Sequence, residues 1–302
     1  LQRRGVTRIF SPDDGRRLGL DGMIDEMMQA CDFVPGEDVV DPEPPDAARP
    51  GTVARWISRI EAGHEPPPSP ATRPPVVGVT GTGGAGKSTL IDELVRRFLA
   101  DFPTLRIAVV AVDPTRRRSG GALLGDRIRM NSLAASDRVF MRSLATRQAH
   151  RSLPEHAGEA VAVCAAAGYE LVILESAGTG QADSEIADFS DLSIYAMTPE
   201  YGAGLQLEKI DMLDFASLVA INKFDRAGAL DALRDVRKQV RRCREAFEVP
   251  DEALPVFATC AHQFHDPGVN GLFRGLLGLL EGRFGSFWKP AWSRADPVGL
   301  PR

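Results

Sequence analysis

Residues 81–88 read Gly-Thr-Gly-Gly-Ala-Gly-Lys-Ser and fill every position of the pattern G-x-x-x-x-G-K-[ST]. An apolar run, residues 76–80, comes directly before them, and a helical pattern, residues 89–98, follows. In this strand–loop–helix context the glycines let backbone N–H groups converge on phosphate oxygens, and the start of the helix adds partial positive charge. We therefore predict a phosphate-binding loop in preference to an ordinary glycine-rich turn.

The residue types in this loop predict individual roles. Lys87 is expected to reach the β- and γ-phosphates and to take part in catalysis, and the Ser88 hydroxyl is expected to ligate Mg²⁺. The residues predicted to contact the nucleotide here are Gly83, Gly84, Ala85, Gly86, Lys87, Ser88 and Thr89.

Beyond the loop, apolar runs alternate with helical patterns. The expected strands are 76–80, 106–112, 139–141, 171–174, 192–196, 218–221 and 255–257, and the expected helices lie near 52–61, 89–98, 124–135, 155–167, 230–247 and 272–284. Continuous apolar strands separated by helices indicate a parallel sheet that is covered on both faces. The predicted fold class is α/β, a three-layer P-loop NTPase fold with a mostly parallel central sheet. Ligands of such sheets bind beyond the carboxyl ends of the strands.

A second motif, Asn222-Lys223-Phe224-Asp225, follows the expected strand 218–221 and matches N-K-x-D. An aspartate carboxylate can accept from both N1–H and the exocyclic amine of guanine, whereas adenine offers no such pair. Asn222 is expected to bind the base edge and hold neighbouring loops, and the Lys223 stem to lie along the ring. After the last expected strand, a further base-contacting loop is predicted at Thr259, Cys260 and Ala261.

Acidic residues stand at several of the same strand ends. Glu175 occupies the place of the acid in the D-x-x-G element of GTPases, and Gly178 that of the glycine whose N–H meets the γ-phosphate. With Ser88, the carboxylates of Asp113, Asp126 and Glu175 fit a hard, oxygen-ligated Mg²⁺ site, although Asp126 also fits a helix N-terminus. Gln181 fits two roles equally, orienting the attacking water in catalysis or lying solvated in a loop.

Composition excludes several classes of function. The 302 residues carry a formal charge of −5, which argues against a general nucleic-acid binder. No apolar run reaches the length that spans a bilayer, and the four scattered cysteines fit neither a disulfide framework nor a zinc site. The cytoplasm is the expected compartment. Two basic stretches, 116–118 and the helix near 230–247, fit solvated surface better than a binding site.

Composition also predicts the domain boundaries. Residues 1–32 hold a short apolar stretch, a turn at 11–15 and an amphipathic helix near 20–28, and we interpret them as the end of a domain. Residues 33–73 are expected to be proline-rich linkers with one short helix, 74–285 the nucleotide-binding domain, and 286–302 a connector. The large aromatic residues of the connector fit two alternatives equally, docking on a neighbouring domain or packing back on their own.

Together these motifs resemble those of the MeaB/ArgK-type GTPases, the chaperones of adenosylcobalamin-dependent acyl-CoA mutases. The resemblance is carried by residues 81–88, 112–114, 119–130, 175–181 and 222–225. It implies that GTP or GDP and Mg²⁺ are the ligands, and that Ser88, Asp113, Asp126 and Glu175 share the metal site. It also implies that GTP binding and hydrolysis gate the loading and release of the mutase cofactor. Residues 114–118 depart from the family, in which many members carry small hydroxyl residues there.

The flanking residues extend the resemblance. Residues 5–20 resemble the end of a flavodoxin-like cobalamin-binding domain, in the order found in natural fusions of an acyl-CoA mutase with its chaperone. The implied partners are the cobalamin-binding and mutase domains, while an adenosyltransferase and a homodimer stay open. The cobalamin-ligating pattern D-x-H-x-x-G does not occur in the sequence, so adenosylcobalamin is expected only in the parent protein.

Two alternative functions remain open. A nickel-delivery GTPase of the same broad fold usually carries a histidine-rich tract or a Cys/His cluster, whereas the five histidines of this chain are scattered. A passive module would bind nucleotide only to hold two larger domains in register, and it would release no phosphate.

Overall fold

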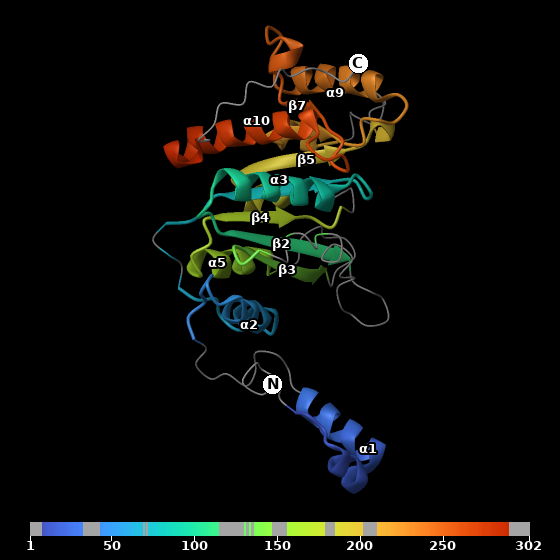
Figure 1. Ribbon diagram of the computed structural model, residues 1–302. Coiled ribbons are helices and arrows are strands. Elements are labelled where there is room, and N and C mark those ends of the chain that lie inside the picture. Colours follow the sequence, from blue (N-terminus) through green and yellow to red (C-terminus); the bar gives the residue numbers. More distant parts are fainter. Residues whose placement is uncertain are drawn as a thin grey trace.

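The computed structural model describes residues 8–32, 43–68, 70, 72–114, 130, 133, 136–146, 156–178, 185–201 and 210–289. Within these ranges a seven-stranded parallel sheet forms the centre, with the strand order β3-β2-β4-β1-β5-β6-β7 (Figure 1). The strands are β1 (Val76–Gly81), β2 (Ile107–Pro114), β3 (Val139–Thr146), β4 (Leu171–Glu175), β5 (Leu192–Met197), β6 (Leu218–Ile221) and β7 (Val256–Ala258). The predicted α/β class with a parallel sheet is confirmed.

Helices cover both faces of this sheet, except α1, which buries none of its residues. The helices are α1 (Pro12–Cys31), α2 (Pro50–Glu61), α3 (Lys87–Asp101), α5 (Ala157–Ala166), α6 (Ile186–Phe189), α8 (Met212–Phe215), α9 (Ala229–Cys243) and α10 (Pro267–Phe284), with 3-10 turns at Pro199–Tyr201, Asp251–Ala253 and Ser286–Trp288. Apolar residues of α3 and α10 pack on one face of the sheet, and those of α2, α5, α6, α8 and α9 pack on the other. The three layers predicted from the sequence are therefore present.

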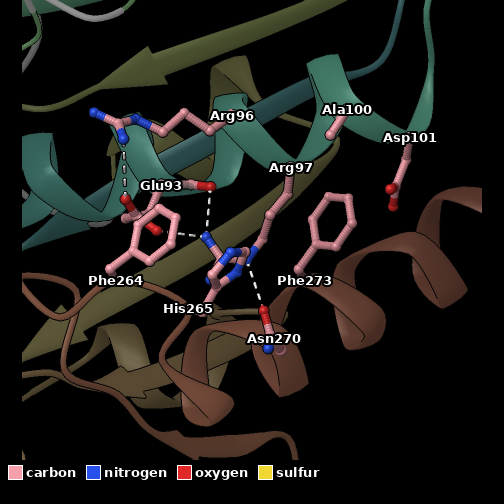
Figure 2. Close-up of a pocket in the computed structure, with 9 residues that line it drawn as sticks. All are labelled: Glu93, Arg96, Arg97, Ala100, Asp101, Phe264, His265, Asn270 and Phe273. Atoms are coloured by element: carbon pink, nitrogen blue, oxygen red, sulfur yellow. Dashed lines mark hydrogen bonds and ion pairs between the residues drawn. The ribbon is translucent and has the colours of Figure 1, made fainter. Parts of the chain in front are cut away.

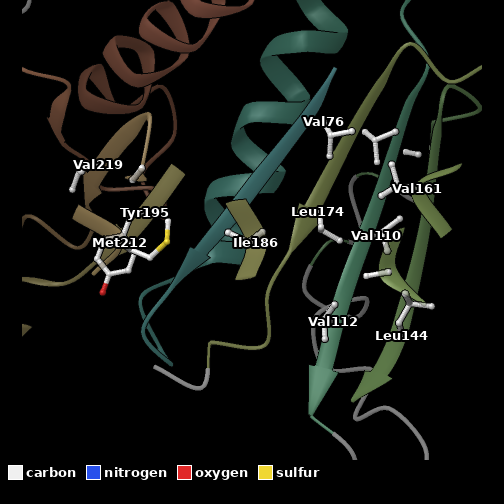
Figure 3. Packing of buried hydrophobic residues seen from close by; sticks show 14 of the residues in the cluster. Val76, Val110, Val112, Leu144, Val161, Leu174, Ile186, Tyr195, Met212 and Val219 are labelled. Carbon is white, nitrogen blue, oxygen red and sulfur yellow. The ribbon is translucent and has the colours of Figure 1, made fainter. Parts of the chain in front are cut away.

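The two apolar cores explain why the strands read as continuous apolar runs. Successive strand residues point to opposite faces of a sheet. Val76 and Val110 belong to the cluster beneath α2 and α5 (Figure 3). Their neighbours Val77 and Val109 belong to the cluster beneath α3 and α10. Both faces of the inner strands β1, β2, β4, β5 and β6 are buried, so nearly every position in them favours an apolar side chain.

Two elements are longer than predicted. β3 extends to Thr146 because it pairs with β2 along its whole length. α10 begins at Pro267 rather than near residue 272, because Asp266 caps its N-terminus and a proline is well tolerated at the first helical position. The predicted helix 124–135 falls almost entirely outside the described residues.

The predicted turn at residues 11–15 is wrong, because α1 begins at Pro12. The Ser11 hydroxyl accepts from the Asp14 amide at 3.2 Å, and the Asp14 carboxylate accepts from the Ser11 amide at 2.9 Å. These two bonds form a capping box, which fixes a helix start. α1 is kinked at Gly19 and buries none of its residues. Of the short apolar stretch before it, residues 5–10, the first three residues fall outside the described ranges and residues 8–10 form neither helix nor strand.

The connector after α10 packs back on its own domain as far as Lys289. The Trp288 ring lies 6.0 Å from the ring of Phe98 and 5.7 Å from that of Phe102, measured between centroids, and only 3% of Trp288 is exposed. Of the two alternatives, packing back is therefore correct for this part of the connector. Among the helices within the described ranges, none has the length and apolar character that crossing a bilayer requires.

Asp266 ties the start of α10 to the loop after β7, which yields a stability prediction. Its Oδ2 accepts from the Val269 amide at 2.8 Å and from the Cys260 amide at 3.1 Å. We expect Asp266→Ala to lower the free energy of unfolding by about 1–2 kcal/mol, because both amides lose their acceptor. Urea denaturation followed by circular dichroism measures this change.

A matched control is Asp231→Ala, which removes an exposed acid from the first turn of α9. Its expected effect stays within about 0.5 kcal/mol. Equal unfolding midpoints for Asp266→Ala and Asp231→Ala would contradict the capping role.

Candidate nucleotide-binding site

The loop between β1 and α3 ends at the N-terminus of a helix. α3 begins at Lys87 with Gly86 as its N-cap, and none of the described side chains caps it by a hydrogen bond. The first amides of a helix have no intrahelical acceptor, and together with the helix dipole they favour a bound anion. Gly86 takes a left-handed φ of 88°, and a Cβ there would lie 2.6 Å from Nδ2 of Asn222. The loop therefore requires glycine where it meets the second motif.

The Lys87 ammonium lies where two loops meet. Its Nζ donates to the carbonyl oxygens of Gly81, at 2.9 Å, and Thr82, at 3.4 Å. Gly178, in the loop after β4, lies so close that a Cβ on it would come within 2.2 Å of this nitrogen. Lys87 is only 8% exposed. A positive charge is therefore held between the phosphate loop and the loop after β4.

Ser88 and Glu175 bring two oxygen donors together. The Ser88 hydroxyl, in the first turn of α3, donates to Oε1 of Glu175 at 2.8 Å, and both residues are buried. Hydroxyl and carboxylate oxygens are hard ligands that suit Mg²⁺. These two members of the predicted metal site therefore fit the ion.

The other predicted members of the metal and catalytic sets are only partly visible. Asp113 is placed by its backbone near the end of β2, and its side chain lies outside the described residues, as do Asp126 and Gln181 entirely. The arginines 116–118 also fall outside. Among the described residues, no group of three His, Cys, Asp or Glu side chains could hold a metal ion.

Asn222 joins three loops at the carboxyl edge of the sheet. Its Nδ2 donates to the Ala85 carbonyl in the phosphate loop at 2.8 Å. Its Oδ1 accepts from the Ala261 amide at 3.0 Å and from the Thr259 hydroxyl at 3.3 Å, both in the loop after β7. The predicted role of Asn222 in holding neighbouring loops therefore matches the geometry.

The rest of the N-K-x-D motif lines the same edge. Lys223 takes a left-handed φ of 58°, and its Nζ donates to the Gly84 carbonyl at 2.7 Å. The Asp225 side chain is 46% exposed, which leaves its carboxylate open to a ligand. The structure thus brings residues 83–88, Gly178, 222–225 and 259–261 together, while Thr89 is exposed on α3.

Sequence reasoning missed several contacts that hold these loops. The hydroxyls of Thr80, in β1, and Ser176, after β4, lie 2.7 Å apart and are buried. Arg226, directly after the motif, forms an ion pair with Glu200, and hydrogen bonds from Thr198 and then Arg226 lower the pKa of Glu200 to about 2. The Asp266-Pro267 pair is a helix-start signal that could have revealed the cap beside Cys260.

Comparisons with known proteins agree with this geometry. The family description that matches residues 68–271 reads "Methylmalonyl Co-A mutase-associated GTPase MeaB". The chain is 48% identical over 305 residues to a fused isobutyryl-CoA mutase of Geobacillus kaustophilus, covering 96% of this chain and 28% of that protein. It is 53% identical over 292 residues to a fused isobutyryl-CoA mutase of Nocardia farcinica, covering 94% of this chain and 27% of that protein. The chain therefore spans little more than a quarter of these relatives.

A solved structure supports the fold. The crystal structure of LAO/AO transport system kinase aligns with a TM-score of 0.53 and 24% identity, covering 77% of this chain and 71% of that one. At this identity the likeness concerns the fold alone, and it agrees with the parallel sheet described above. The family match covers more than half of the chain and includes both nucleotide motifs. The chain therefore belongs to the MeaB family of methylmalonyl-CoA mutase-associated GTPases.

Proposed function

We propose that the chain binds GTP and hydrolyses it to GDP and phosphate. The observation that carries this proposal is the Asn222 side chain, which bonds the phosphate loop through Ala85 and the loop after β7 through Ala261. This arrangement supports a triphosphate site and a guanine site side by side at the carboxyl edge of the sheet, where ligands of such sheets bind. Family membership and the motif Asn222–Asp225 support guanine over adenine.

In the proposed complex, each residue acts on a different part of the nucleotide. The first amides of α3 and the Lys87 ammonium hold the β- and γ-phosphates and stabilise the charge that develops during transfer. Ser88 and Glu175 hold Mg²⁺, which supplies further neutralisation of the phosphate oxygens when it is bound. Asp225 accepts from the guanine edge. Asp113 and Asp126 complete the metal site, and Gln181 orients the attacking water.

We further propose that the chain acts within a longer protein that contains an isobutyryl-CoA mutase, where the nucleotide cycle gates loading and release of adenosylcobalamin. The long relatives and the family description support this proposal. The exposed apolar residues Leu20, Ile24, Met27 and Met28 of α1 support packing of this helix against the rest of the cobalamin-binding domain, whose end residues 5–20 resemble. An exposed apolar face of this kind is typical of a docking surface.

Isothermal titration with GTP, GDP and ATP, with and without Mg²⁺, tests the proposed binding. We expect GTP and GDP to bind and ATP not to bind measurably. Phosphate release from GTP then separates an enzyme from a passive module: release above the rate of the free nucleotide supports hydrolysis, and no release refutes it. Tight stoichiometric Ni²⁺ binding by the nucleotide-free protein would favour the nickel-delivery alternative instead.

The metal role of Glu175 gives a prediction of its own. We expect Glu175→Gln to weaken GTP binding in Mg²⁺ by about 10- to 100-fold, the usual cost of losing a residue that supports a metal site. GTP binding in excess EDTA should stay near the wild-type value, because the substitution keeps the shape of the side chain. Titration under both conditions measures the difference.

The control is Glu248→Gln, which makes the same change at an exposed residue after α9. This variant should keep the full effect of Mg²⁺ on GTP binding. An unchanged Mg²⁺ effect in Glu175→Gln as well would remove Glu175 from the metal site.

A further inference from the structure

The carboxylate of Asp225 is contacted on both sides by the loop after β7. Its Oδ1 accepts from the Cys260 thiol, with a sulfur–oxygen distance of 3.7 Å, and its Oδ2 lies 3.7 Å from Nε2 of His262. A half-exposed aspartate can turn about its side-chain bonds unless a neighbour holds it. A cavity of about 200 Å³, lined in part by Phe224, Cys260 and Gln263, lies beside it and leaves room for such a turn.

The sulfur of Cys260 is itself held in place by its backbone. The Cys260 amide donates to Asp266 at 3.1 Å, its carbonyl accepts from Gln263 at 2.8 Å, and the residue is only 7% exposed. The loop is therefore a rigid support for the thiol, in contrast to the exposed imidazole of His262.

The far end of this loop is joined to α10 by the Asp266 cap, while Phe264 and His265 just before it are exposed. Phe264 and His265 lie beside α3 and α10 at a pocket of about 150 Å³, and their ring centroids are 4.0 Å apart (Figure 2). In the same pocket Arg97 donates to Asn270 at 2.9 Å and so joins α3 to α10. The loop that carries Cys260 is thus anchored at both of its ends, by β7 and by α10.

The thiol has the protonation state that this contact needs. Burial raises the pKa of Cys260, and the carboxylates of Asp266 and Asp225 raise it further. At neutral pH the group is therefore a thiol, which donates to a carboxylate, rather than a thiolate, which would repel it.

We propose that Cys260 is a positioning residue for base recognition: its S–H group holds Oδ1 of Asp225 so that the carboxylate faces both N1–H and the exocyclic amine of guanine. This inference rests on the proposed binding of guanine nucleotides. It adds the residue that fixes the orientation of the Asp225 carboxylate toward the base. Without the thiol donor, Asp225 turns toward His262 or the neighbouring cavity, and its two-point contact with the base weakens.

Comparison of GDP with inosine diphosphate tests the proposal, because inosine lacks the exocyclic amine. The measured quantity is the ratio of the two dissociation constants, obtained by calorimetry for the wild type, Cys260→Ala and Cys260→Ser. We expect Cys260→Ala to reduce the preference for GDP by roughly three- to tenfold, the cost of one weak hydrogen bond. Cys260→Ser should restore it, because a hydroxyl also donates to the carboxylate. Cys243→Ser, on α9, is the matched thiol control and should leave the ratio unchanged.

The outcomes separate the inference from the function on which it rests. Equal weakening of GDP and inosine diphosphate binding by Cys260→Ala would mean that Cys260 only supports the loop, and this would overturn the proposal. A preference for GDP that is unchanged in Cys260→Ala would overturn it too. Failure of the wild type to bind GDP would refute the proposed function itself. Thermal unfolding of each variant without nucleotide shows that the compared proteins are equally folded.

Discussion

Replacement of Lys87 by alanine is expected to weaken GTP binding by at least about a hundredfold and to abolish hydrolysis. The ammonium is buried between the carbonyls of Gly81 and Thr82 and the nearby Gly178, where it is expected to meet the β- and γ-phosphates. Removing one partner of a buried charge pair costs about 3–5 kcal/mol. At about 1.4 kcal/mol per tenfold change, this corresponds to at least two orders of magnitude in the dissociation constant. Calorimetry and steady-state phosphate release measure both effects.

Lys238→Ala is the matched control, because it removes an exposed lysine from α9, on the opposite face of the sheet from α3. It should bind and hydrolyse GTP as the wild type does. The nucleotide-free Lys87→Ala protein should unfold at a lower temperature than the wild type, because the buried carbonyl of Gly81 loses its donor, so binding is compared at a temperature where both proteins are folded. Retention of wild-type GTP affinity by Lys87→Ala would refute the assignment of the phosphate site.

Asp225→Asn is expected to exchange the preference for guanine for a preference for xanthine. The asparagine amide donates, so it opposes the exocyclic amine of guanine and instead matches the second carbonyl oxygen of xanthine. A wrong two-point contact with a base edge costs about 1–3 kcal/mol, so we expect GDP binding to weaken and xanthosine diphosphate binding to strengthen by roughly ten- to a hundredfold each. Competition titrations with the two diphosphates measure the exchange.

The exposed aspartate of α9 provides the control for this exchange. Asp231→Asn changes the net charge by the same amount and lies on the solvated side of the helix, so it should keep the preference for guanine. Loss of both nucleotides by Asp225→Asn, with no gain for xanthine, would show that Asp225 supports the loop rather than reads the base.

The sheet and the phosphate loop were predictable because their signals are local. Both faces of the inner strands β1, β2, β4, β5 and β6 are buried, so these strands read as apolar runs, and residues 81–88 contain the glycines that the turn requires. The parallel order then places the loops after β1, β4, β6 and β7 at one edge. Because these loops share one edge of the sheet, the sequence alone was sufficient to predict that Lys87 and Glu175 lie near the N-K-x-D motif.

Other features depend on information that no short window of sequence contains. The residues Ser11 and Pro12 fit a turn as well as a helix start, and Asp14 decides between them only through its bond to the Ser11 amide. The pairs Thr80–Ser176 and Cys260–Asp225 depend on the register of strands that are far apart in the chain. The sequence pattern places such residues at an edge of the sheet, but it does not say which atoms touch.

The single amide of Asn222 has a consequence for protein engineering. Because it satisfies the Ala85 carbonyl and the Ala261 amide at once, a chimera that transplants only residues 222–225 from an adenine-specific protein would leave polar groups in two other loops without partners. Nucleobase preference in this fold therefore depends on three loops together: the phosphate loop, the loop after β6 and the loop after β7. Directed evolution toward a new base should produce coupled changes in all three loops.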